Sequence, residues 1–335
     1  MRKILAVIPA RSGSKSVIDK NIRLINDKPM IAFSIEHALQ SKYINRIIVS
    51  TDSEKYAAIA REYGAETPFI RPSELATDTA LDIDVFEHTL NYLEKNEEYI
   101  PDIVVHLRPT YPIRSVSDID RMIEIMIENP NVDSVRSISK AKELAYKMWF
   151  VDESKSMEPI LKNIPEAYNM PRQQLPTIYY QNACIDIIKP SVISEQHSMT
   201  GKEIKGYEIK HNFDIDTEED FFKAEQYLKL LRGKNRFVFD IDGVIANYNP
   251  NLDYDNSEPN QEMINVINNL FEGGNEIILF TARGYVTGYD WENVTKKQME
   301  NWGVKFHELK FGKPNADFYI DDKMLSIFDC LDLLS

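Results

Sequence analysis

The sequence has few cysteines, no long apolar run and no low-complexity tract. Its 335 residues include two cysteines, Cys184 and Cys330, which fall in the two separate domains that we infer below. A disulfide framework is therefore not expected, and a reducing compartment fits this composition. The longest apolar runs, such as Ile277–Phe280, are far too short to span a bilayer.

Positive charge is also scarce. The chain carries 39 Lys and Arg against 53 Asp and Glu, a formal net charge of −14. This balance argues against a nucleic-acid partner, whose phosphate backbone requires clustered positive charge. A local group of basic residues beside Mg²⁺ can still hold one triphosphate. The apolar stretch Ile4–Ile8 is too short for a signal-peptide core, so we expect a buried strand, no export signal, no membrane partner and a cytoplasmic enzyme.

Short apolar runs alternate with amphipathic segments from the first residues onward. Strands are expected at Ile4–Ile8, Arg46–Ser50 and Asp102–Leu107, and helices at Met30–Leu39, Glu54–Glu62, Asp84–Leu93 and Asp118–Ile127. This alternation predicts an α/β fold with a parallel sheet and helices on both faces. Ligands of such sheets bind at the carboxyl ends of the strands, so we expect the chemistry after Ile8, Ser50 and Leu107.

The alternation breaks between residues 135 and 190 and resumes after residue 235. The region of the break is rich in β-type runs and prolines, which predicts strands that project from the sheet as an arm. Glu218–Leu231 is typical of an amphipathic helix, and the polar segment 232–235 follows it. The second series has expected strands at Arg236–Asp240, Glu276–Phe280 and Phe318–Ile320, and expected helices at Met263–Phe271 and Val294–Trp302. We therefore expect two domains, residues 1–231 and 236–335.

The loop after the first strand combines small and basic residues. It reads Ala10-Arg11-Ser12-Gly13-Ser14-Lys15, and Lys20-Asn21 follow downstream. Small residues let backbone N–H groups approach a phosphate, and the basic side chains neutralise it. The spacing is not that of a P-loop. Taken alone, a solvated turn with scattered charges fits these residues as well as a phosphate loop does.

Six further stretches give this loop a context. They are Ser50–Asp52, Arg71–Thr79, Pro109–Arg114, Tyr146–Trp149, Arg172–Pro176 and Phe213–Asp220. Together with the loop, and in the same order, they resemble the acylneuraminate cytidylyltransferases, the CMP-sialic acid synthetase family. The resemblance covers about residues 1–230. It implies a Rossmann-like nucleotidyltransferase fold with a mixed sheet, a β-rich dimerisation arm, and CTP as the nucleotide.

The resemblance also implies roles for individual residues. Arg11 and Lys15 would hold the triphosphate and stabilise the charge that develops as pyrophosphate leaves. The residues that would bind the nucleotide are Ala10, Arg11, Ser14, Lys15, Lys20, Asn21 and Arg71. Those that would contact the acidic acceptor are Arg108, Lys147, Arg172 and Gln173, with Arg172 reaching across a dimer interface.

Two carboxylates precede the helix expected at Glu218. Asp214 and Asp216 are two residues apart, so on an extended segment their side chains share one face. Such a pair suits Mg²⁺, which takes a few hard oxygen ligands and keeps several waters. The alternative is an acidic turn before the helix, with Asp216 or Thr217 as the N-cap.

One departure from the family bears on the acceptor. Arg108 stands where the family usually has glutamine, at a position that contacts the sugar. A fixed guanidinium fork there favours a carboxylate, a phosphate or a phosphonate. The acceptor is therefore expected to differ from ordinary N-acetylneuraminic acid.

The second domain carries four motifs in order. They are Phe239–Ile245 with Asp240 and Asp242, Leu279–Gly284 with Thr281, Phe311–Pro314 with Lys313, and Tyr319–Lys323 with Asp321 and Asp322. They resemble the motifs of the haloacid dehalogenase-like phosphatases, over about residues 236–335. The resemblance implies a smaller α/β domain. The gaps on either side of Thr281 are too short for a cap domain, so a capless site is expected. Such a site is either closed by a neighbouring subunit or the other domain, or accepts large substrates.

This resemblance implies a phosphatase mechanism. Asp240 would be the nucleophile that forms an aspartyl-phosphate, and Asp242 would protonate the leaving group and then activate water. Thr281 and Lys313 would bind phosphate, and Asp240, Asp242, Asp321 and Asp322 would form the Mg²⁺ site. The alternative is a retained fold with an inactive site that serves only in assembly.

The leading interpretation is a bifunctional enzyme. Its first domain transfers CMP from CTP to a nonulosonic, sialic-acid-like sugar, and its second hydrolyses a related phosphate ester. The runner-up keeps CTP but makes the acceptor a phosphonate or phosphomonoester. A homodimer or homotetramer is expected in either case.

Overall fold

The computed structural model describes residues 2–14, 17–209, 213–231, 234–247 and 254–316, together with 324 and 326. The chain divides into two compact units, Met1–Leu228 and Lys229–Ser335. Among the described residues, no helix has the length and apolar character needed to cross a membrane.

A six-stranded sheet forms the centre of the first unit, in the order β10-β6-β9-β5-β1-β4. The strands are β1 Ile4–Pro9, β4 Arg46–Ser50, β5 Ile103–Leu107, β6 Ser134–Lys140, β9 Tyr179–Ile188 and β10 Ile204–Glu208. Strand β1 lies between β5 and the edge strand β4 and pairs in parallel with both. Both faces of β1 and β5 are buried, which explains why β1 is a continuous apolar run and why β5 is apolar except for His106.

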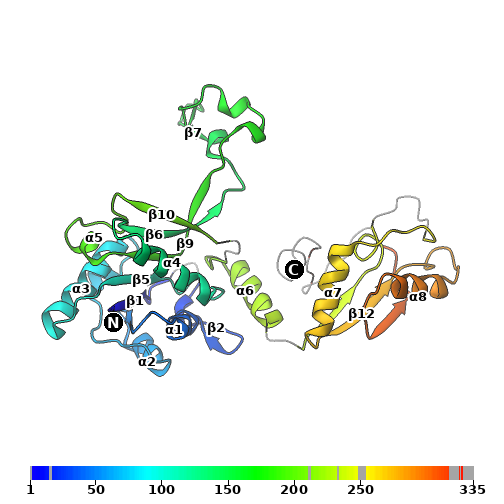
Figure 1. Cartoon of the computed structure of the whole chain (residues 1–335), viewed down its shortest axis with the longest axis horizontal. Coiled ribbons are helices and arrows are strands. Elements are labelled where there is room, and N and C mark those ends of the chain that lie inside the picture. Colours follow the sequence, from blue (N-terminus) through cyan, green and yellow to red (C-terminus); the bar gives the residue numbers. More distant parts are fainter. Residues whose placement is uncertain are drawn as a thin grey trace. The chain divides into compact units, whose positions relative to one another are not determined.

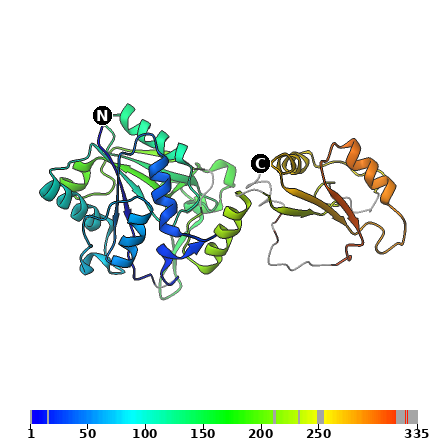
Figure 2. The ribbon, with the colours of Figure 1, turned by 90° about the horizontal axis from the view of Figure 1, so that it is seen from below.

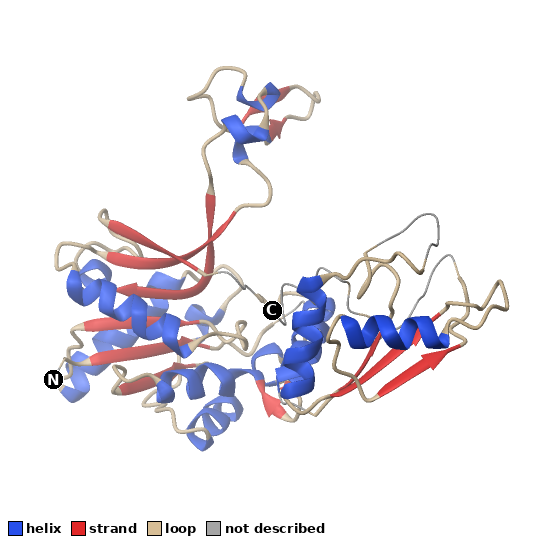
Figure 3. Ribbon diagram, turned by 45° about the vertical axis from the view of Figure 1, so that its right-hand side comes forward, coloured by secondary structure: helices blue, strands red, loops and turns tan. Residues whose placement is uncertain are grey.

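Helices cover both faces of this sheet (Figure 2, Figure 3). They are α1 Met30–Gln40, α2 Glu54–Glu62, α3 Asp82–Glu97, α4 Val116–Glu128, α5 Pro190–Ser194 and α6 Glu218–Leu231. Because side chains alternate along a strand, β1 feeds two cores. Ile4 and Ile8 pack in the core that includes α1 and α4, whereas Leu5 and Val7 pack in the core that includes α3 and α5. Burying one such side chain contributes about 1.5–3 kcal/mol.

The sheet is mixed, whereas the strand–helix alternation by itself predicted a parallel one. Strand β9 runs antiparallel to both β5 and β6, and β10 runs parallel to β6. The reason is the connection between β6 and β9. Residues 141–178 leave the sheet after Lys140 and return opposite it at Tyr179, so the two strands pair like the arms of a long hairpin.

Residues 141–178 form an arm that stands away from the sheet (Figure 1). The arm holds an antiparallel pair, β7 Trp149–Val151 and β8 Met157–Pro159, and three 3₁₀ turns, Ala145–Lys147, Ala167–Asn169 and Arg172–Gln174. It has its own small apolar cluster of Leu144, Tyr146, Ala167 and Leu175. The projecting β-rich arm expected from the sequence is present.

Shorter elements complete the first unit around its loops. They are the antiparallel pair β2 Leu24–Ile25 and β3 Lys28–Pro29, and the 3₁₀ turns Lys20–Ile22 and Ser73–Ala76. Asn26 and Asp27 join β2 to β3 with positive φ angles, which short polar residues tolerate in hairpin turns. This hairpin carries Ile25 into a cluster with Phe221 and Ala224 of α6.

A three-stranded parallel sheet in the order β11-β12-β13 forms the second unit. Its elements are β11 Arg236–Phe239, α7 Gln261–Glu272, β12 Glu276–Thr281, α8 Glu292–Asn301 and β13 Glu308–Phe311. Helix α7 begins at the N-cap Asn260, whose side chain accepts from Met263 N at 3.3 Å, and it buries Met263 and Ile267. The strand expected at Phe318–Ile320 lies outside the described residues.

Candidate functional site

A pocket of about 530 Å³ opens at the carboxyl ends of β1 and β5 in the first unit. Its walls come from the loop after β1, from the segment between Arg71 and Val85, and from the start of the loop after β5. The residues named from the sequence that line it are Arg11, Ser14, Lys20, Asn21, Arg71 and Arg108. The structure therefore brings these six residues together at the carboxyl ends of β1 and β5, two of the three strand ends at which the sequence predicted the chemistry.

The loop after β1 is held by hydrogen bonds within the unit. Ser12 donates to the Asp52 carboxylate from its N–H at 2.9 Å and from its hydroxyl at 2.7 Å. The Asn21 side-chain amide donates to Arg11 O at 2.9 Å. Ala10 is fully buried, and its N–H donates to Ser50 O at 2.9 Å, so this amide closes the loop against β4 and does not face a ligand. Lys15 lies outside the described residues.

Asp52 is a residue to which the sequence analysis gave no role. It fixes the loop by accepting both donors of Ser12, although the two residues are 40 positions apart. The signal was its place in Ser50–Asp52, directly after a buried strand that neighbours β1. Carboxyl ends of parallel strands meet at one edge, so a carboxylate there can reach the neighbouring loop.

Three basic side chains of the pocket differ in their ionic and hydrogen-bond partners. Arg11 pairs with Asp78 at 2.7 Å, and Lys20 donates to Ile215 O at 2.8 Å and pairs with Asp216 at 3.1 Å. Arg71 differs, because it is 4% exposed and its Nε and Nη2 have no hydrogen-bond partner among the described residues. Burial lowers the pKa of Arg71 below its ordinary value. A buried cation without a partner is costly, and an anionic or carbonyl-bearing ligand in the pocket would satisfy it.

Arg108 is held by carboxylates of its own chain. Its Nη2 donates to Asp82 at 2.9 Å, and its Nη1 donates to Asp186 at 3.0 Å and to Ala183 O at 2.8 Å. Asp186 is fully buried and also lies 3.5 Å from Arg136. Arg108 therefore lines the pocket as part of an ionic network that ties the start of α3 to β9. The guanidinium fork expected to face an acceptor anion is directed at these carboxylates.

Asp214 and Asp216 differ in environment. Asp214 Oδ1 is buried and accepts no hydrogen bond from the described residues, and burial raises the pKa of Asp214. Asp216 is exposed apart from its pairing with Lys20. The N-cap of α6 is Thr217, whose hydroxyl accepts from Asp220 N at 3.2 Å while the Asp220 carboxylate accepts from Thr217 N at 2.9 Å. Neither Asp214 nor Asp216 is used as a cap, which leaves Asp214 available for a cation.

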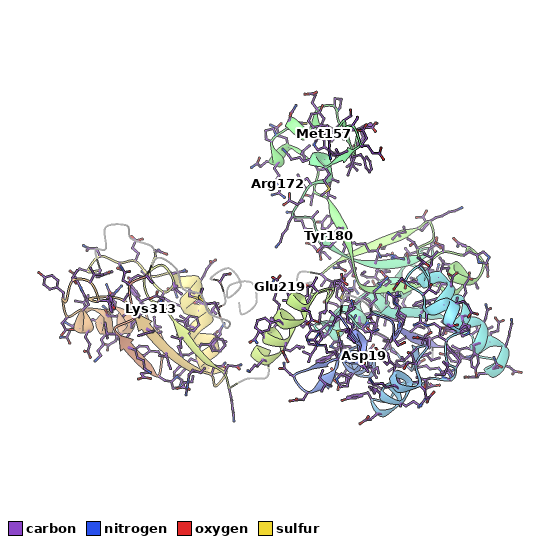
Figure 4. All side chains as sticks on the ribbon, turned by 180° about the vertical axis from the view of Figure 1, so that it is seen from behind. Asp19, Met157, Arg172, Tyr180, Glu219 and Lys313 are labelled. Carbon is purple, nitrogen blue, oxygen red and sulfur yellow. The ribbon has the colours of Figure 1, made fainter. Side chains whose placement is uncertain are left out.

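The three acceptor residues named on the arm do not line the pocket. Lys147 donates to Tyr168 O at 3.3 Å and to Met170 O at 2.9 Å, so it ties two turns of the arm together. Arg172 and Gln173 lie in the 3₁₀ turn Arg172–Gln174, and Figure 4 shows Arg172 on the arm, away from Asp19 in the body of the unit. Within one chain these residues do not meet the nucleotide loop.

The second unit gathers its predicted residues at the carboxyl ends of its strands. Asp240 follows β11, and its Oδ2 pairs with Lys313 Nζ, which follows β13. The Asp240 Oδ1 accepts from Ile241 N at 2.8 Å. Thr281 ends β12, is fully buried, and its carbonyl accepts from Lys313 N at 3.1 Å. The Asp240 carboxylate and the Lys313 ammonium group therefore pair at one edge of the sheet, and the backbone of Lys313 is held at the end of β12 by Thr281.

Asp242 has a partner that the sequence analysis missed. Arg283 Nη2 donates to Asp242 Oδ1 at 2.7 Å, and Arg283 Nε donates to Asp242 Oδ2 at 2.9 Å. Arg283 stands two residues after Thr281 in the motif Leu279–Gly284, and that position was its only signal in the sequence.

The magnesium ligands of the two sites can be compared only in part. Asp321 and Asp322 lie outside the described residues. Among the residues that are described, no three His, Cys, Asp or Glu side chains come together as a metal cluster. Mg²⁺ bound to a nucleotide needs only one or two carboxylates beside the phosphate oxygens, so Asp214 with its unpartnered oxygen fits such an ion.

Three known proteins are similar to the first unit. Post-translational flagellin modification protein B of Campylobacter coli is 36% identical over 68% of this chain and 96% of its own length. CMP-N,N'-diacetyllegionaminic acid synthase of Legionella pneumophila is 35% identical over 68% of this chain and 97% of its own. N-acylneuraminate cytidylyltransferase of Escherichia coli O18:K1:H7 is 31% identical over 71% of this chain and 54% of its own.

A solved structure shares the fold of the first unit. It is CMP:2-keto-3-deoxy-manno-octonic acid synthetase complexed with CTP, with a TM-score of 0.52 and 17% identity. The match covers 68% of this chain and 98% of that one. This likeness confirms the Rossmann-like nucleotidyltransferase fold with a mixed sheet.

The family follows from the sequence itself. Residues 5–241 match the cytidylyltransferase family, a span that contains the pocket, the arm and α6. The resemblance to the acylneuraminate cytidylyltransferases is confirmed by these comparisons, and the chain belongs to the cytidylyltransferase family.

Proposed function

We propose that the first unit transfers CMP from CTP to a nonulosonic, sialic-acid-like sugar acid and releases pyrophosphate. The observation that carries this proposal is Arg71, a buried cation of the pocket beside Arg11 and Lys20, whose Nε and Nη2 have no hydrogen-bond partner in the described part of the chain. Relatives at 31–36% identity include an N-acylneuraminate cytidylyltransferase and a CMP-N,N'-diacetyllegionaminic acid synthase.

The reaction assigns a task to each pocket group. A hydroxyl oxygen of the acceptor attacks the α-phosphorus of CTP, the bond from that phosphorus to the bridging oxygen breaks, and pyrophosphate leaves with the electron pair. The hydroxyl proton passes to solvent or a nearby base. Arg11 and Lys20 neutralise the phosphate oxygens, and Arg71 binds a polar group of the nucleotide. Positioning by these fixed side chains supplies much of the rate.

Magnesium is proposed as the cofactor, with Asp214 as a ligand. The buried Asp214 Oδ1 has no hydrogen-bond partner among the described residues, and a bound cation would offset the burial that raises the pKa of this carboxyl. Mg²⁺ there would neutralise charge on the triphosphate. Asp214→Asn should abolish the Mg²⁺ dependence of CTP affinity measured by calorimetry. An unchanged dependence would remove Asp214 from the ligand set.

A phosphonate or phosphomonoester acceptor is not proposed. That alternative rested on Arg108 as a free anion fork, and the hydrogen bonds of Arg108 go to Asp82, Asp186 and Ala183. Three carboxylate or carbonyl acceptors already compensate this guanidinium, so a second anion has less to gain from it.

The experiment that tests the transfer reaction is pyrophosphate release with CTP and Mg²⁺ over a panel of acceptors. The panel holds sialic, legionaminic, pseudaminic and ketodeoxy sugar acids, with small phosphonates and phosphate monoesters as controls. We expect turnover with a nine-carbon sugar acid alone. Turnover with only a phosphonate or phosphate ester would reject the proposal, and Asp240→Asn serves as a matched variant with an intact first unit.

We also propose that the arm serves the pocket of a second copy, as a homodimer. Lys147, Arg172 and Gln173 lie outside the pocket of their own chain, and the arm exposes Phe150 and Met157 to 62% and 58%. Exposed apolar side chains of this size are typical of an interface. Light scattering should give a dimer that Phe150→Ser weakens, and a wild-type monomer that is fully active would refute the arrangement.

For the second unit we propose a phosphomonoesterase that acts on a phosphorylated relative of the acceptor. Asp240 is the nucleophile, Asp242 the proton donor and acceptor, and Thr281 and Lys313 bind the phosphate. The observation that supports it is the ion pair of Asp240 with Lys313 at the carboxyl ends of the strands, where the backbone of Lys313 also bonds to that of Thr281. We expect Asp240→Asn to abolish phosphatase turnover and leave transfer unchanged. If wild-type protein hydrolyses no phosphate ester, the unit serves in assembly instead.

A further inference from the structure

Arg283 makes an ionic contact in the second unit that neither resemblance assigns. It is 2% exposed, and its Nε and Nη2 form a fork on the two oxygens of Asp242, at 2.9 and 2.7 Å. The carboxylate end is less enclosed, because the Asp242 side chain is 32% exposed. A buried cation therefore binds one side of a carboxylate whose other side is accessible to solvent.

Arg283 is itself held from two directions. Its Nη1 donates to Thr295 Oγ1 at 3.2 Å and to Gln298 Oε1 at 2.6 Å, both on α8. The ring of Tyr254 lies 4.7 Å from its guanidinium carbon, a distance at which a cation is attracted to an aromatic face. A side chain with this many partners has little rotational freedom. The position of α8 therefore determines where the Arg283 guanidinium, and with it the Asp242 carboxylate, lies.

The backbone next to Arg283 directs the side chain inward. Arg283 N donates to Thr281 Oγ1 at 3.1 Å, which joins it to a predicted phosphate-binding residue. Gly284 follows with a φ of +81°, and a Cβ there would lie 2.3 Å from Tyr289 O. Only glycine fits this turn without strain, so the chain leaves the site immediately after placing Arg283.

The fork leaves Asp242 able to exchange a proton. Oδ1 accepts from both Nε and Nη2, whereas Oδ2 accepts from Nε alone among the described residues. A carboxylate has about four lone-pair sites, so Oδ2 keeps capacity on its open side. The fork fixes the plane of the carboxylate and thereby the direction in which that oxygen faces.

We propose that Arg283 is the positioning residue that aims Asp242 at the ester oxygen of the substrate. This inference rests on the phosphatase proposed above. In the first step an Asp240 oxygen attacks phosphorus, the bond from phosphorus to the ester oxygen breaks, and that oxygen leaves with the proton of Asp242. In the second step water attacks the aspartyl-phosphate, its proton passes to Asp242, and the bond to Asp240 breaks to release phosphate.

The orientation of Asp242 matters most for a substrate whose leaving group must be protonated as it departs. A nitrophenolate leaves readily without protonation, whereas a phenolate is more basic and depends more on an acid. Misdirecting Asp242 should therefore slow phenyl phosphate far more than p-nitrophenyl phosphate. A purely structural role for Arg283 would lower the amount of active protein and slow both substrates equally.

The experiment measures kcat and KM of the full-length protein with p-nitrophenyl phosphate and phenyl phosphate, two rings of similar size. For Arg283→Gln we expect kcat with phenyl phosphate to fall about 100-fold, kcat with p-nitrophenyl phosphate to fall less than about 10-fold, and both KM values to stay within about threefold. Arg283→Lys should rescue little, because an ammonium group cannot form the fork. Arg236→Gln, which removes an exposed arginine paired with Glu276 in the same unit, is the control and should change neither rate.

Two further variants keep the proposal testable if Arg283→Gln folds poorly. Gln298→Met removes one anchor of Arg283 at similar volume and should slow phenyl phosphate selectively by about threefold to tenfold. In an Asp242→Asn background, Arg283→Gln should add little, since the residue it positions is already gone. Equal losses on both substrates, or no loss, would overturn the proposal. A wild-type protein that hydrolyses neither ester would instead refute the phosphatase itself, and this inference with it.

Discussion

The two candidate sites differ in how their charges are compensated. In the first unit a buried cation, Arg71, has unpartnered nitrogens, and the buried carboxylate Asp214 has an unpartnered oxygen, among the described residues. In the second unit the charged groups of the site pair with each other, Asp240 with Lys313 and Asp242 with Arg283. The first site leaves charge that a ligand would compensate, whereas in the described part of the second site a substrate would have to replace a protein contact.

This difference has energetic consequences. An unpaired buried charge destabilises the free protein, so its removal can raise stability while it abolishes binding. Removing one member of a buried pair has the opposite effect, because the other charge remains uncompensated. Substitutions of the unpaired and the paired arginines of the first unit should therefore change stability in opposite directions.

The largest effect is expected for Arg71→Met. CTP affinity measured by calorimetry should fall about 100-fold, as for the loss of a buried charged hydrogen-bond donor. The melting temperature of the ligand-free protein should stay the same or rise, because the change removes two buried nitrogens that have no hydrogen-bond partner among the described residues. Arg71→Lys should lie between wild type and Arg71→Met in affinity. A variant that binds CTP normally would show that the pocket does not use this cation.

A large effect on stability is expected for Arg108→Gln, at the paired arginine of the same pocket. The change leaves Asp186 buried with a weaker set of partners, so unfolding free energy should fall by about 3 kcal/mol. Scanning calorimetry can measure it from the transition that CTP shifts. Asp82→Asn is the control and should cost less, because Asp82 is more exposed than Asp186. A stable variant with altered acceptor preference would instead restore the interpretation of Arg108 as an anion fork.

The smallest expected effect is on the pH dependence of stability, through a buried histidine of β5. His106 is fully buried, and its ring nitrogens have no hydrogen-bond partner among the described residues, although Nδ1 lies 3.8 Å from Asp186 Oδ2. Burial together with Arg108 and Arg136 holds the pKa of His106 well below its ordinary value. The unfolded chain then binds a proton near pH 6.5 that the folded chain does not. Stability from this group is therefore complete above that pH and lost as pH falls below it.

Between pH 7 and pH 5 the loss from His106 should be about 2 kcal/mol. His106→Asn should remove this loss from the pH dependence of the free energy of unfolding, measured by denaturant titration at pH 7 and pH 5. His197, an exposed histidine, supplies the control substitution His197→Asn. If both variants track wild type, His106 titrates normally in the folded chain.

Much of the first unit could be predicted because its signals are local. Buried parallel strands such as Ile4–Ile8 are continuous apolar runs, and helix-period residues such as Ile119, Met122, Ile123 and Met126 of α4 are all buried in the structure. The direction of β9 could not be predicted from periodicity, because antiparallel and parallel strands share the same alternation of side chains. Its direction is set by the arm that returns the chain beside β6.

The partners of the site arginines could not be predicted for a related reason. Arg108 meets Asp82 and Asp186, 26 and 78 positions away, and Arg283 meets Asp242, 41 positions away. No local pattern distinguishes an arginine that waits for a ligand from one that is neutralised by a distant strand. The sequence analysis expected the charge of Arg108 to face an acceptor, and the structure compensates that charge inside the protein.

The Arg108 network limits how position 108 can change in this protein. A substitution at position 108 changes the ionic partners of Asp186 and, through Asp186, those of Arg136. Replacing Arg108 alone by glutamine leaves the buried Asp186 carboxylate without its closest cation, whereas changing Asp186 first leaves Arg136 and Arg108 without that carboxylate. Neither order offers a neutral first step. We therefore expect position 108 to change only together with its partners, through simultaneous replacement of strand β9 and the loop after β5. To alter this position in the laboratory, both segments should be exchanged in one step.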